Sequence, residues 1–317
     1  MSLLRHQLAE LIQASSQLWS GLAGARLFIT GASGFFGCWL LETLLFARSR
    51  FGLELEVVAL TRDPVAFLER TPHLAGAITL VQGDVRDFPF PNGPFSHVVH
   101  AAAEVGSGEG ILAGGLRVLR MAERSQAGHC LLVSSGAVYG PSSQFIKEED
   151  DLAPLSEYGK AKLELERVWE ERAVSARCFA FLGPYLSLDS GLAAADFFHD
   201  ALAGQPLRVQ GNGLTQRSYL YAGELAVWLW TLLLKGKPGR AYNVGSMQAV
   251  PVLELAELIA SVAGGLPVQV LGNKAGNDYL PDTTRIQKEL GVTQSIALPE
   301  AVARTWAWFK STPWPPT

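Results

Sequence analysis

The sequence predicts an α/β fold, a doubly wound parallel sheet with a smaller C-terminal α+β part. Short apolar runs alternate with longer amphipathic segments through the first 182 residues, as is typical of strands buried on both faces. The alternation breaks down after Gly183-Pro184. We therefore expect an N-terminal helix in 1–24, a sheet domain in 25–182 and a mainly substrate-binding part in 183–317. The boundary at 182 is soft, because later segments are expected to add strands to the sheet.

The elements follow from periodicity, taken in chain order. Leu4, Leu8, Leu11 and Ile12 recur at helical spacing, which predicts an amphipathic helix on the outside of the sheet domain. We expect strands at 26–30, 56–61, 78–82, 97–101, 130–134 and 175–181, and helices at 36–50, 65–70, 111–126 and 157–172. Further on we expect helices at 194–203, 223–234 and 252–262, with strands at 207–209, 218–221 and 241–244.

Composition excludes several classes of function. The 317 residues carry a net charge of −4 without long runs of either sign, so no basic face for nucleic acid is expected. No apolar run approaches the ~18 residues of a membrane span, and the N-terminus lacks a signal-peptide core. We expect a cytoplasmic protein without a membrane partner. Cys38, Cys130 and Cys178 lie in apolar patterns without metal-ligand spacing, so we interpret them as buried side chains and expect no metal site.

A glycine-rich turn follows the first predicted strand. Gly31-Ala32-Ser33-Gly34-Phe35-Phe36-Gly37 separates this strand from an apolar helix. Glycines allow a tight turn and a close backbone approach to a pyrophosphate, whose charge then lies at the helix N-terminus. We therefore predict a Rossmann dinucleotide site. Its expected contacts here are Gly31, Ser33, Gly34, Phe35, Phe36 and Gly37.

The end of the second strand bears on the choice of cofactor. A site for NAD places a carboxylate there for the adenosine ribose, but this chain has Thr61 at that position, followed by Arg62. A guanidinium suits a ribose 2′-phosphate, because it binds phosphate bidentately. We therefore favour NADP(H). Asp63 keeps NAD(H) possible, and a merely solvated Arg62 is the third interpretation.

Tyr158 and Lys162 form a Tyr-xxx-Lys pair on a predicted helix. Residues four apart share a helix face, and an ammonium near a phenol of pKa ~10 favours the phenolate. Tyr158 is thus the predicted acid/base, exchanging a proton with a substrate hydroxyl while hydride moves to or from the cofactor. Lys160 is expected to point elsewhere, into solvent.

Together these motifs resemble the extended short-chain dehydrogenase/reductases, NAD(P)-dependent epimerases, dehydratases and ketoreductases of nucleotide sugars. The resemblance rests on Thr30 to Gly37, on Tyr158 with Lys162, and on Ser134-Ser135-Gly136-Ala137-Val138-Tyr139-Gly140. It implies that Ser135 hydrogen-bonds the reacting sugar oxygen, that Ser134 faces the opposite way, and that Tyr139 is structural. It also implies cofactor contacts from Asp84, Val85, Ala101, Ala102, Ala103, Tyr158 and Lys162.

The resemblance extends to the substrate side. It implies that Arg217 and Arg285 converge on the substrate's diphosphate, whereas a usual Asn contact is replaced by Ala180. The Asn243 strand and the tryptophans Trp228 and Trp230 are expected to be structural, the tryptophans in the core or at an interface. Relatives often pair through the helices that correspond to 111–126 and 157–172, so a homodimer is possible.

One absence narrows the expected reaction. Relatives that dehydrate a hexose or decarboxylate a uronic acid place an acidic residue just after the catalytic hydroxyl, whereas this chain has Gly136 and Ala137. The nearby acidic run 148–151 is interpreted as a solvated loop. We expect an NADP(H)-preferring oxidoreductase at C4 of a nucleotide-linked (6-deoxy) sugar, as 4-ketoreductase or 4-epimerase. A NAD-dependent sugar-nucleotide dehydratase, a reductase of non-nucleotide ketones and a non-catalytic NADP-binding sensor remain as alternatives.

Overall fold

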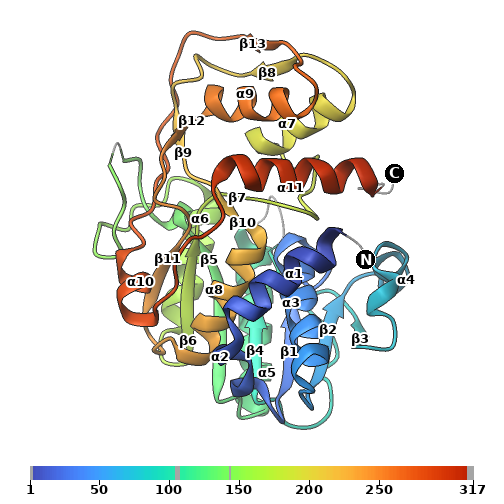
Figure 1. The fold of residues 1–317 in the computed structure, drawn as a ribbon. Helices are drawn as coiled ribbons and strands as arrows, with labels where there is room; N and C mark the ends of the chain where they lie inside the picture. The colour runs from blue at the N-terminus through green and yellow to red at the C-terminus, as the bar shows by residue number, and fades with distance from the viewer. Residues whose placement is uncertain (1–2, 104–107, 143, 313–317) are drawn as a thin grey trace.

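A seven-stranded parallel sheet forms the centre of the molecule (Figure 1). The computed structural model describes residues 3–103, 108–142 and 144–312. The strand order is β11-β6-β5-β4-β1-β2-β3, which confirms the predicted fold. The strands are β1 (Arg26–Thr30), β2 (Glu56–Thr61), β3 (Thr79–Gln82), β4 (His97–His100), β5 (His129–Ser135), β6 (Ala173–Cys178) and β11 (Ala241–Val244). The winding reverses between β1 and β4, where open α/β sheets bind their ligands.

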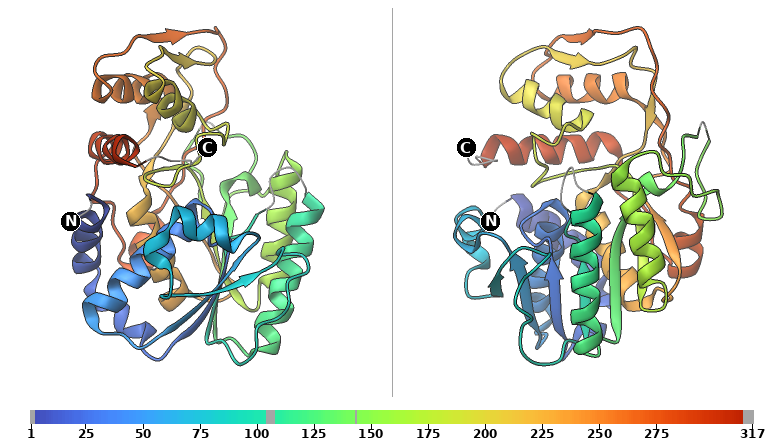
Figure 2. Two further views of the ribbon diagram at one scale, coloured as in Figure 1. Left: turned by 90° about the vertical axis from the view of Figure 1, so that its right-hand side faces the viewer. Right: turned by 180° about the vertical axis from the view of Figure 1, so that it is seen from behind.

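Helices cover both faces of this sheet (Figure 2). One face carries α3 (Phe35–Phe51) and α8 (Ala222–Lys235), and the other carries α5 (Gly108–Arg124) and α6 (Glu157–Trp169). Along β1, Leu27 and Ile29 belong to the core on the α3 side, whereas Phe28 belongs to the core under α5 and α6. Burial on both faces explains why the strands read as continuous apolar runs.

The N-terminal segment packs on the outside of the sheet domain, as predicted. It forms α1 (Leu3–Ala14), α2 (Ser16–Trp19) and the short η1 (Ser20–Leu22), and α1 lies against α3 and α8. Polar contacts join α1 to the C-terminal part: Tyr221 donates a hydrogen bond to Gln7, and Arg304 pairs with Glu10 at 2.9 Å.

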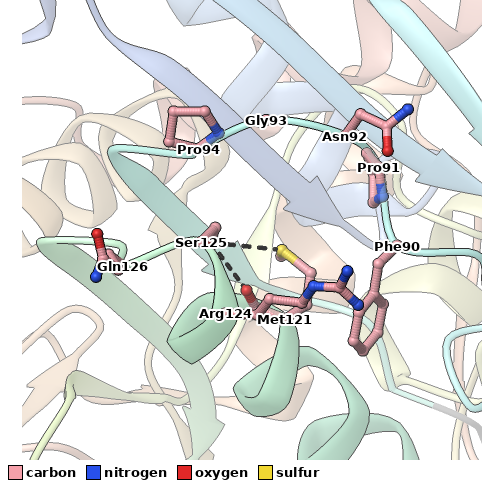
Figure 3. A pocket seen from close by; sticks show the side chains of 9 residues that line it. All are labelled: Phe90, Pro91, Asn92, Gly93, Pro94, Met121, Arg124, Ser125 and Gln126. Atoms are coloured by element: carbon pink, nitrogen blue, oxygen red, sulfur yellow. Dashed lines mark hydrogen bonds between the residues drawn. The ribbon is translucent and has the colours of Figure 1, made fainter.

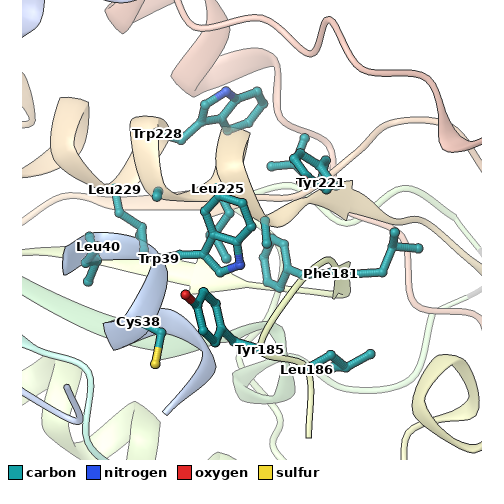
Figure 4. Close-up of a cluster of buried hydrophobic side chains, with 14 of the residues drawn as sticks. Cys38, Trp39, Leu40, Phe181, Tyr185, Leu186, Tyr221, Leu225, Trp228 and Leu229 are labelled. Atoms are coloured by element: carbon teal, nitrogen blue, oxygen red, sulfur yellow. The ribbon is translucent and has the colours of Figure 1, made fainter. Parts of the chain in front are cut away.

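An aromatic cluster joins α3, α8 and the segment after β6 (Figure 4). Trp39 lies at its centre, where its Nε1 donates to the carbonyl of Pro184 at 2.7 Å. Its ring meets Tyr185 at 6.3 Å and Tyr221 at 5.5 Å between centroids. Trp228 is buried here, and Trp230 is buried against Trp19. The core interpretation of the two tryptophans is therefore confirmed.

The C-terminal part lies over the carboxyl ends of the strands (Figure 1). Three small two-stranded sheets build it, and β11 returns from it to the main sheet beside β6. The pairs are β7 (Phe181–Leu182) with β10 (Leu220–Tyr221), β8 (Leu207–Val209) with β13 (Val268–Val270), and β9 (Gln216–Arg217) with β12 (Val250–Pro251). The helices are α7 (Ala193–Leu202), α9 (Val252–Val262), α10 (Thr284–Leu290) and α11 (Leu298–Ser311). The sequence interpretation did not place β13, α10 or α11.

The remaining helical elements are short: α4 (Pro64–Arg70), η2 (Pro72–Leu74) and η3 (Gly136–Val138). Cys38, Cys130 and Cys178 are free and buried, as predicted. Within the described ranges, no helix combines the length and apolarity that crossing a membrane requires.

Candidate active site

The glycine turn joins β1 to α3 at the carboxyl edge of the sheet. Gly31 has a φ of +72°, and a Cβ on it would lie 2.7 Å from the backbone of Ala101 and Ala102. A Cβ on Gly37 would lie 2.2 Å from the carbonyl oxygen of Gly31. Gly34 is the N-cap of α3 and provides no side-chain cap, so the first-turn N–H groups are available to an anion. This cradle fits a pyrophosphate, with Ser33, Phe35 and Phe36 half-exposed in it.

Beside the turn, Arg62 and Asp63 differ in what they contact. The Arg62 guanidinium is exposed and makes no hydrogen bond or ion pair with any residue that the structure describes. Asp63 instead accepts the Ala66 N–H at 3.0 Å and caps α4, a role that stabilises a helix N-terminus. Arg62 is therefore the available charge at this edge, whereas Asp63 already has a structural partner.

The loops after β3 and β4 lie at the same carboxyl end of the sheet as the glycine turn. Asp84 accepts hydrogen bonds from Arg86, which hold the pKa of its carboxyl below the usual value. Val85 packs against α5, where a Cβ on Gly114 would lie 2.7 Å from its Cγ1. Thr30 joins the loops after β1 and β4, because its Oγ1 lies 2.8 Å from His100 Nδ1 and accepts the Ala102 N–H at 3.3 Å. Ala101 and Ala102 are half-buried and Ala103 is exposed.

The structure brings Ser135, Tyr158 and Lys162 together. Ser135 ends β5, and its Oγ accepts the Ala137 N–H at 3.1 Å. Tyr158 lies in the first turn of α6 with 37% of its surface exposed. Lys162 is buried, with its Nζ donating to the Val133 carbonyl at 2.8 Å and lying 5.8 Å from the centroid of the Tyr158 ring. Lys160 points into solvent and pairs with Glu157 at 2.7 Å, as predicted.

Two residues that sequence reasoning missed set the position of α6. The Ser156 hydroxyl caps the helix by accepting the Gly159 N–H at 3.0 Å. A Cβ on Gly159 would lie 2.2 Å from the Ala137 carbonyl oxygen, so only a glycine lets α6 approach the η3 turn so closely. The Ser-x-x spacing before Gly159 is a capping signal that the sequence does contain.

Burial dominates the proton affinities at this site. It lowers the pKa of Lys162 to about 8. It also raises the pKa of Tyr158 above the usual phenol value, although hydrogen bonding to Ser135 opposes this rise. The expected lowering of the Tyr158 pKa by Lys162 is therefore not what this structure has. The physical reason is that burial of the Tyr158 phenol disfavours its charged form, and this is the largest effect on its pKa.

A buried polar network lies behind β5. Ser134 donates to Glu166 at 2.5 Å, and Glu166 pairs with Arg177 at 2.8 Å. Arg177 also donates to the Tyr139 hydroxyl at 2.7 Å, which in turn donates to Asn243 at 2.9 Å. These contacts confirm that Ser134 faces away from Ser135 and that Tyr139 and Asn243 are structural. Sequence reasoning missed Glu166 and Arg177, which no motif marks.

The two predicted substrate arginines lie in different surroundings. Arg217 donates to the carbonyls of Gln216 and Asn277 at 2.9 and 2.6 Å. Its guanidinium carbon lies 6.0 Å from the centroid of the Tyr279 ring. The Tyr279 hydroxyl would be 2.5 Å from a Cβ on Gly136, so Arg217 is near the catalytic turn. Tyr279 is a further site residue that sequence reasoning missed.

Arg285 does not share this location, which corrects the expectation of convergence. Its guanidinium pairs with Glu149, lies 3.7 Å from Glu148 and donates to the Ala241 carbonyl at 2.8 Å. Ala241 begins β11, about 10 Å along the strand from its carboxyl end. Glu148 is also not solvated: its side chain is 4% exposed and accepts the Asn243 N–H. Glu149, Asp150 and Asp151 are exposed, as expected of a solvated loop, so Glu148 is the exception in this acidic run.

A separate cavity of about 330 Å³ opens near the amino-terminal end of β4, away from the carboxyl ends of the strands (Figure 3). It lies between the 90–94 loop before β4 and Met121, Arg124, Ser125 and Gln126 at the end of α5. Ligands of such sheets bind at the carboxyl ends of the strands. This cavity is therefore distinct from the candidate site.

The fold and these residues define an enzyme of the dinucleotide-binding α/β class. Residues 27–245 match the model of the NAD dependent epimerase/dehydratase family. This match spans more than half of the chain, so the chain belongs to that family.

Individual relatives are more distant. A dTDP-glucose 4,6-dehydratase of Streptomyces niveus is 28% identical over 90% of this chain and 93% of the relative. Among solved structures, a dTDP-glucose 4,6-dehydratase of Bacillus anthracis with NAD has a TM-score of 0.79 at 19% identity, covering 90% of this chain and 97% of its own. A UDP-glucuronic acid 4-epimerase of Bacillus cereus with NAD has a TM-score of 0.77 at 20% identity, covering 90% and 99%. These structures support the fold.

Proposed function

We propose that this protein is an NADP(H)-preferring oxidoreductase that acts at C4 of a nucleotide-linked sugar. The observation that carries the proposal is the cluster of Ser135, Tyr158 and Lys162 beside the glycine turn. The relatives support the substrate class, because they are named as enzymes of dTDP-glucose and UDP-glucuronic acid. In the reaction, hydride passes between the nicotinamide and sugar C4, and a proton passes between Tyr158 and the sugar oxygen.

Each residue has a proposed role. Tyr158 is the acid/base, and the Ser135 hydroxyl orients the reacting oxygen. Lys162 contributes an ammonium that faces the Tyr158 ring at 5.8 Å. The α3 N-terminus binds the pyrophosphate, and Arg217 binds the diphosphate of the substrate. Arg285 has no proposed substrate contact, because carboxylates already neutralise it.

The preference for NADP(H) rests on Arg62. Arg62 is exposed directly after β2, the strand that pairs with β1 before the glycine turn. Its neighbour Asp63 is already occupied as a helix cap. A 2′-phosphate would find a bidentate partner in Arg62. NAD(H), which the solved relatives contain, remains the alternative cofactor.

A 4,6-dehydratase is the second candidate, because the curated relatives with the widest coverage carry that name. Elimination of water across C5 and C6 needs a positioned acid. The turn after Ser135 has only Gly136 and Ala137, and the space above Gly136 is taken by Tyr279. These two observations favour the 4-ketoreductase or 4-epimerase over the dehydratase.

Product analysis separates these reactions. Purified protein is incubated with nucleotide 4-keto-6-deoxy sugars and with their 4-hydroxy counterparts, each with NADPH or NAD⁺. Stoichiometric NADPH loss indicates a reductase, isomerisation without net cofactor change an epimerase, and a new 4-keto-6-deoxy product a dehydratase. Turnover of simple ketones alone would instead support a reductase of non-nucleotide ketones, and cofactor binding without turnover a sensor. Tyr158→Phe should abolish each activity, and a retained activity would contradict the assigned role.

A homodimer remains a proposal. The helices α5 and α6 lie side by side on one face of the sheet (Figure 2), and pairing through them would build a four-helix bundle. Light scattering at micromolar concentration tests this, with a monomeric mass as the contradicting result.

A further inference from the structure

A buried carboxylate joins α3 to the segment that follows β7. Glu42 lies on α3, the helix that begins at the glycine turn, and its side chain is 7% exposed. The Tyr185 hydroxyl donates to the Glu42 Oε1 at 2.5 Å, and the His73 Nε2 lies 2.5 Å from the same oxygen. Because a carboxylate only accepts hydrogen bonds, both groups act as donors. Burial of a carboxylate costs free energy unless it is paired and hydrogen-bonded, so Glu42 depends on these two partners.

Tyr185 has a backbone conformation that needs such an anchor. Its φ is +70°, in the left-handed region that is costly for a residue with a Cβ. Gln126 also has a positive φ, but it follows the end of α5, where a left-handed residue commonly closes a helix. Tyr185 follows the short strand β7 instead, so helix termination does not explain it. A conformation of this kind persists only where the surrounding contacts over-determine it.

Those contacts come from both parts of the chain. The Tyr185 ring meets Trp39 of α3 at 6.3 Å between centroids (Figure 4). On the other side it meets Trp308 of α11 at 5.1 Å. The carbonyl of the preceding Pro184 accepts the Trp39 Nε1–H at 2.7 Å. Two hydrogen bonds thus fasten this turn to α3, and ring packing fastens it to the C-terminal part.

The same segment runs past the candidate site. Upstream of the turn, Cys178 pairs with Ser135 between β6 and β5. Phe181 then packs on Phe36 of the glycine turn at 5.5 Å between ring centroids. The segment 178–186 therefore passes from the Ser135 strand end to the glycine turn before it enters the C-terminal part. Its place affects how the proposed cofactor site faces the proposed substrate side.

We propose that Glu42 is a positioning residue that holds Tyr185, and with it the turn 183–186, against α3, so that the C-terminal part keeps a fixed place over the glycine turn. The inference rests on the proposed function, because it concerns the same site. Hydride transfer requires that the nicotinamide and sugar C4 be held in one geometry. The bond between Glu42 and Tyr185 serves this requirement, because it links the helix of the cofactor cradle to the segment that leads into the proposed substrate-binding part.

Hydrogen exchange in the absence of substrate tests this link directly. Tyr185→Phe keeps the packed ring and removes the hydroxyl. We expect the backbone amides of 183–192 to exchange about tenfold faster or more, since a hydrogen bond to a charged group is lost, while the strands of the sheet keep their protection. Unchanged exchange in 183–192, or an equal loss of protection across the whole sheet, overturns the proposal.

Tyr242→Phe is the matched control. It removes a hydroxyl that donates to another carboxylate, that of Glu289, at 3.0 Å from β11. Exchange in 183–192 should be unchanged in this variant. An acceleration there equal to that of Tyr185→Phe would show a general effect of losing a phenol, and it would contradict the proposal.

Glu42→Gln tests whether the effect runs through Glu42. In this background Tyr185→Phe should accelerate exchange in 183–192 by a much smaller factor, because the charged acceptor is already gone. An undiminished factor overturns the route through Glu42.

Kinetics test the positioning role itself. If the wild type turns over a nucleotide sugar, Tyr185→Phe should lower kcat by about tenfold or more, with the Kd of the reduced cofactor unchanged. A raised Kd with unchanged kcat contradicts the positioning role. If the wild type turns over no such sugar, the proposed function fails, and hydrogen exchange still decides whether Glu42 holds Tyr185.

Discussion

Gly159 in the first turn of α6 lies against the carbonyl of Ala137, so close that a Cβ on Gly159 would be 2.2 Å from that oxygen. This contact joins the helix that carries Tyr158 to the turn that follows Ser135. The distance between the hydroxyls of Ser135 and Tyr158, the proposed catalytic pair, therefore depends on a residue that has no reactive group of its own.

Gly159→Ala should displace α6 and slow catalysis. A methyl group that finds no space costs about 1–3 kcal/mol in the free energy of unfolding, and a shift of Tyr158 relative to Ser135 should lower kcat more than it raises KM. Gly128→Ala is the matched control, because a Cβ there meets nothing within 4 Å. Thermal melting and steady-state kinetics measure both effects. Equal kinetics in the two variants would contradict the positioning role.

Lys162→Met should lower turnover by roughly 100-fold, the scale of a group that supports general acid/base catalysis. In the wild type, the charge of Lys162 is present below its pKa of about 8 and is lost above it. The rate should therefore fall as pH rises through that value. The pH–rate profile of Lys162→Met should lack this decrease. Lys160→Met removes an exposed lysine of the same helix and should leave the pH–rate profile unchanged.

Arg62→Ala should weaken NADPH binding by at least about tenfold, since a charge-assisted bidentate contact contributes ~1.5–3 kcal/mol. NADH binding should change little, because NADH lacks the 2′-phosphate. Fluorescence titration of the two reduced cofactors measures the ratio. Arg124→Ala, in the cavity near the amino-terminal end of β4, is the control. An equal loss for both cofactors would argue against a 2′-phosphate contact.

Arg217→Ala should change ligand affinity but not stability, whereas Arg285→Ala should change stability but not ligand affinity. Arg217→Ala should weaken binding of a nucleoside diphosphate, measured by calorimetry, with little loss of stability. Arg285→Ala leaves the buried carboxylate of Glu148 without its partner cation, so it should lower the melting temperature while nucleoside diphosphate affinity is retained. Loss of affinity in Arg285→Ala with wild-type stability would restore the diphosphate role expected from the motif.

Two buried histidines should make the fold sensitive to acid. Burial lowers the pKa of His97 to about 4 and that of His100 to about 3, against 6.5 for an exposed histidine. Below pH 6.5 the unfolded chain binds these protons and the folded chain does not. Their contribution to stability is thus complete above pH 6.5 and is lost as pH falls toward 4 and 3. Urea unfolding across this range should show a shallower pH dependence in His97→Gln, and an unchanged slope would contradict the assignment.

Much of the fold, and the grouping of the candidate site residues, follows from sequence alone. Most strands of the sheet are short runs buried on both faces, whereas β3 at the edge is not. The predicted boundaries of β1 and β2 agree with the structure residue for residue. The sequence predicts Ser135, Tyr158 and Lys162 because their proposed chemistry requires fixed local spacing, on one strand end and one helix turn, and the structure brings the three residues together. The glycine turn was found for the same reason, since its backbone geometry excludes other residues.

Other features depend on contacts between distant segments, which no local pattern encodes. Tyr279 reaches the Ser135 turn because it bridges to β9, and Arg285 meets Glu148 and Glu149 more than 130 residues earlier in the chain. The raised pKa of Tyr158 is of the same kind, because burial by the surrounding elements is its largest cause. Sequence determined which groups can react. Tertiary packing decided their partners and their charge, because desolvation and proximity arise only once the chain is folded.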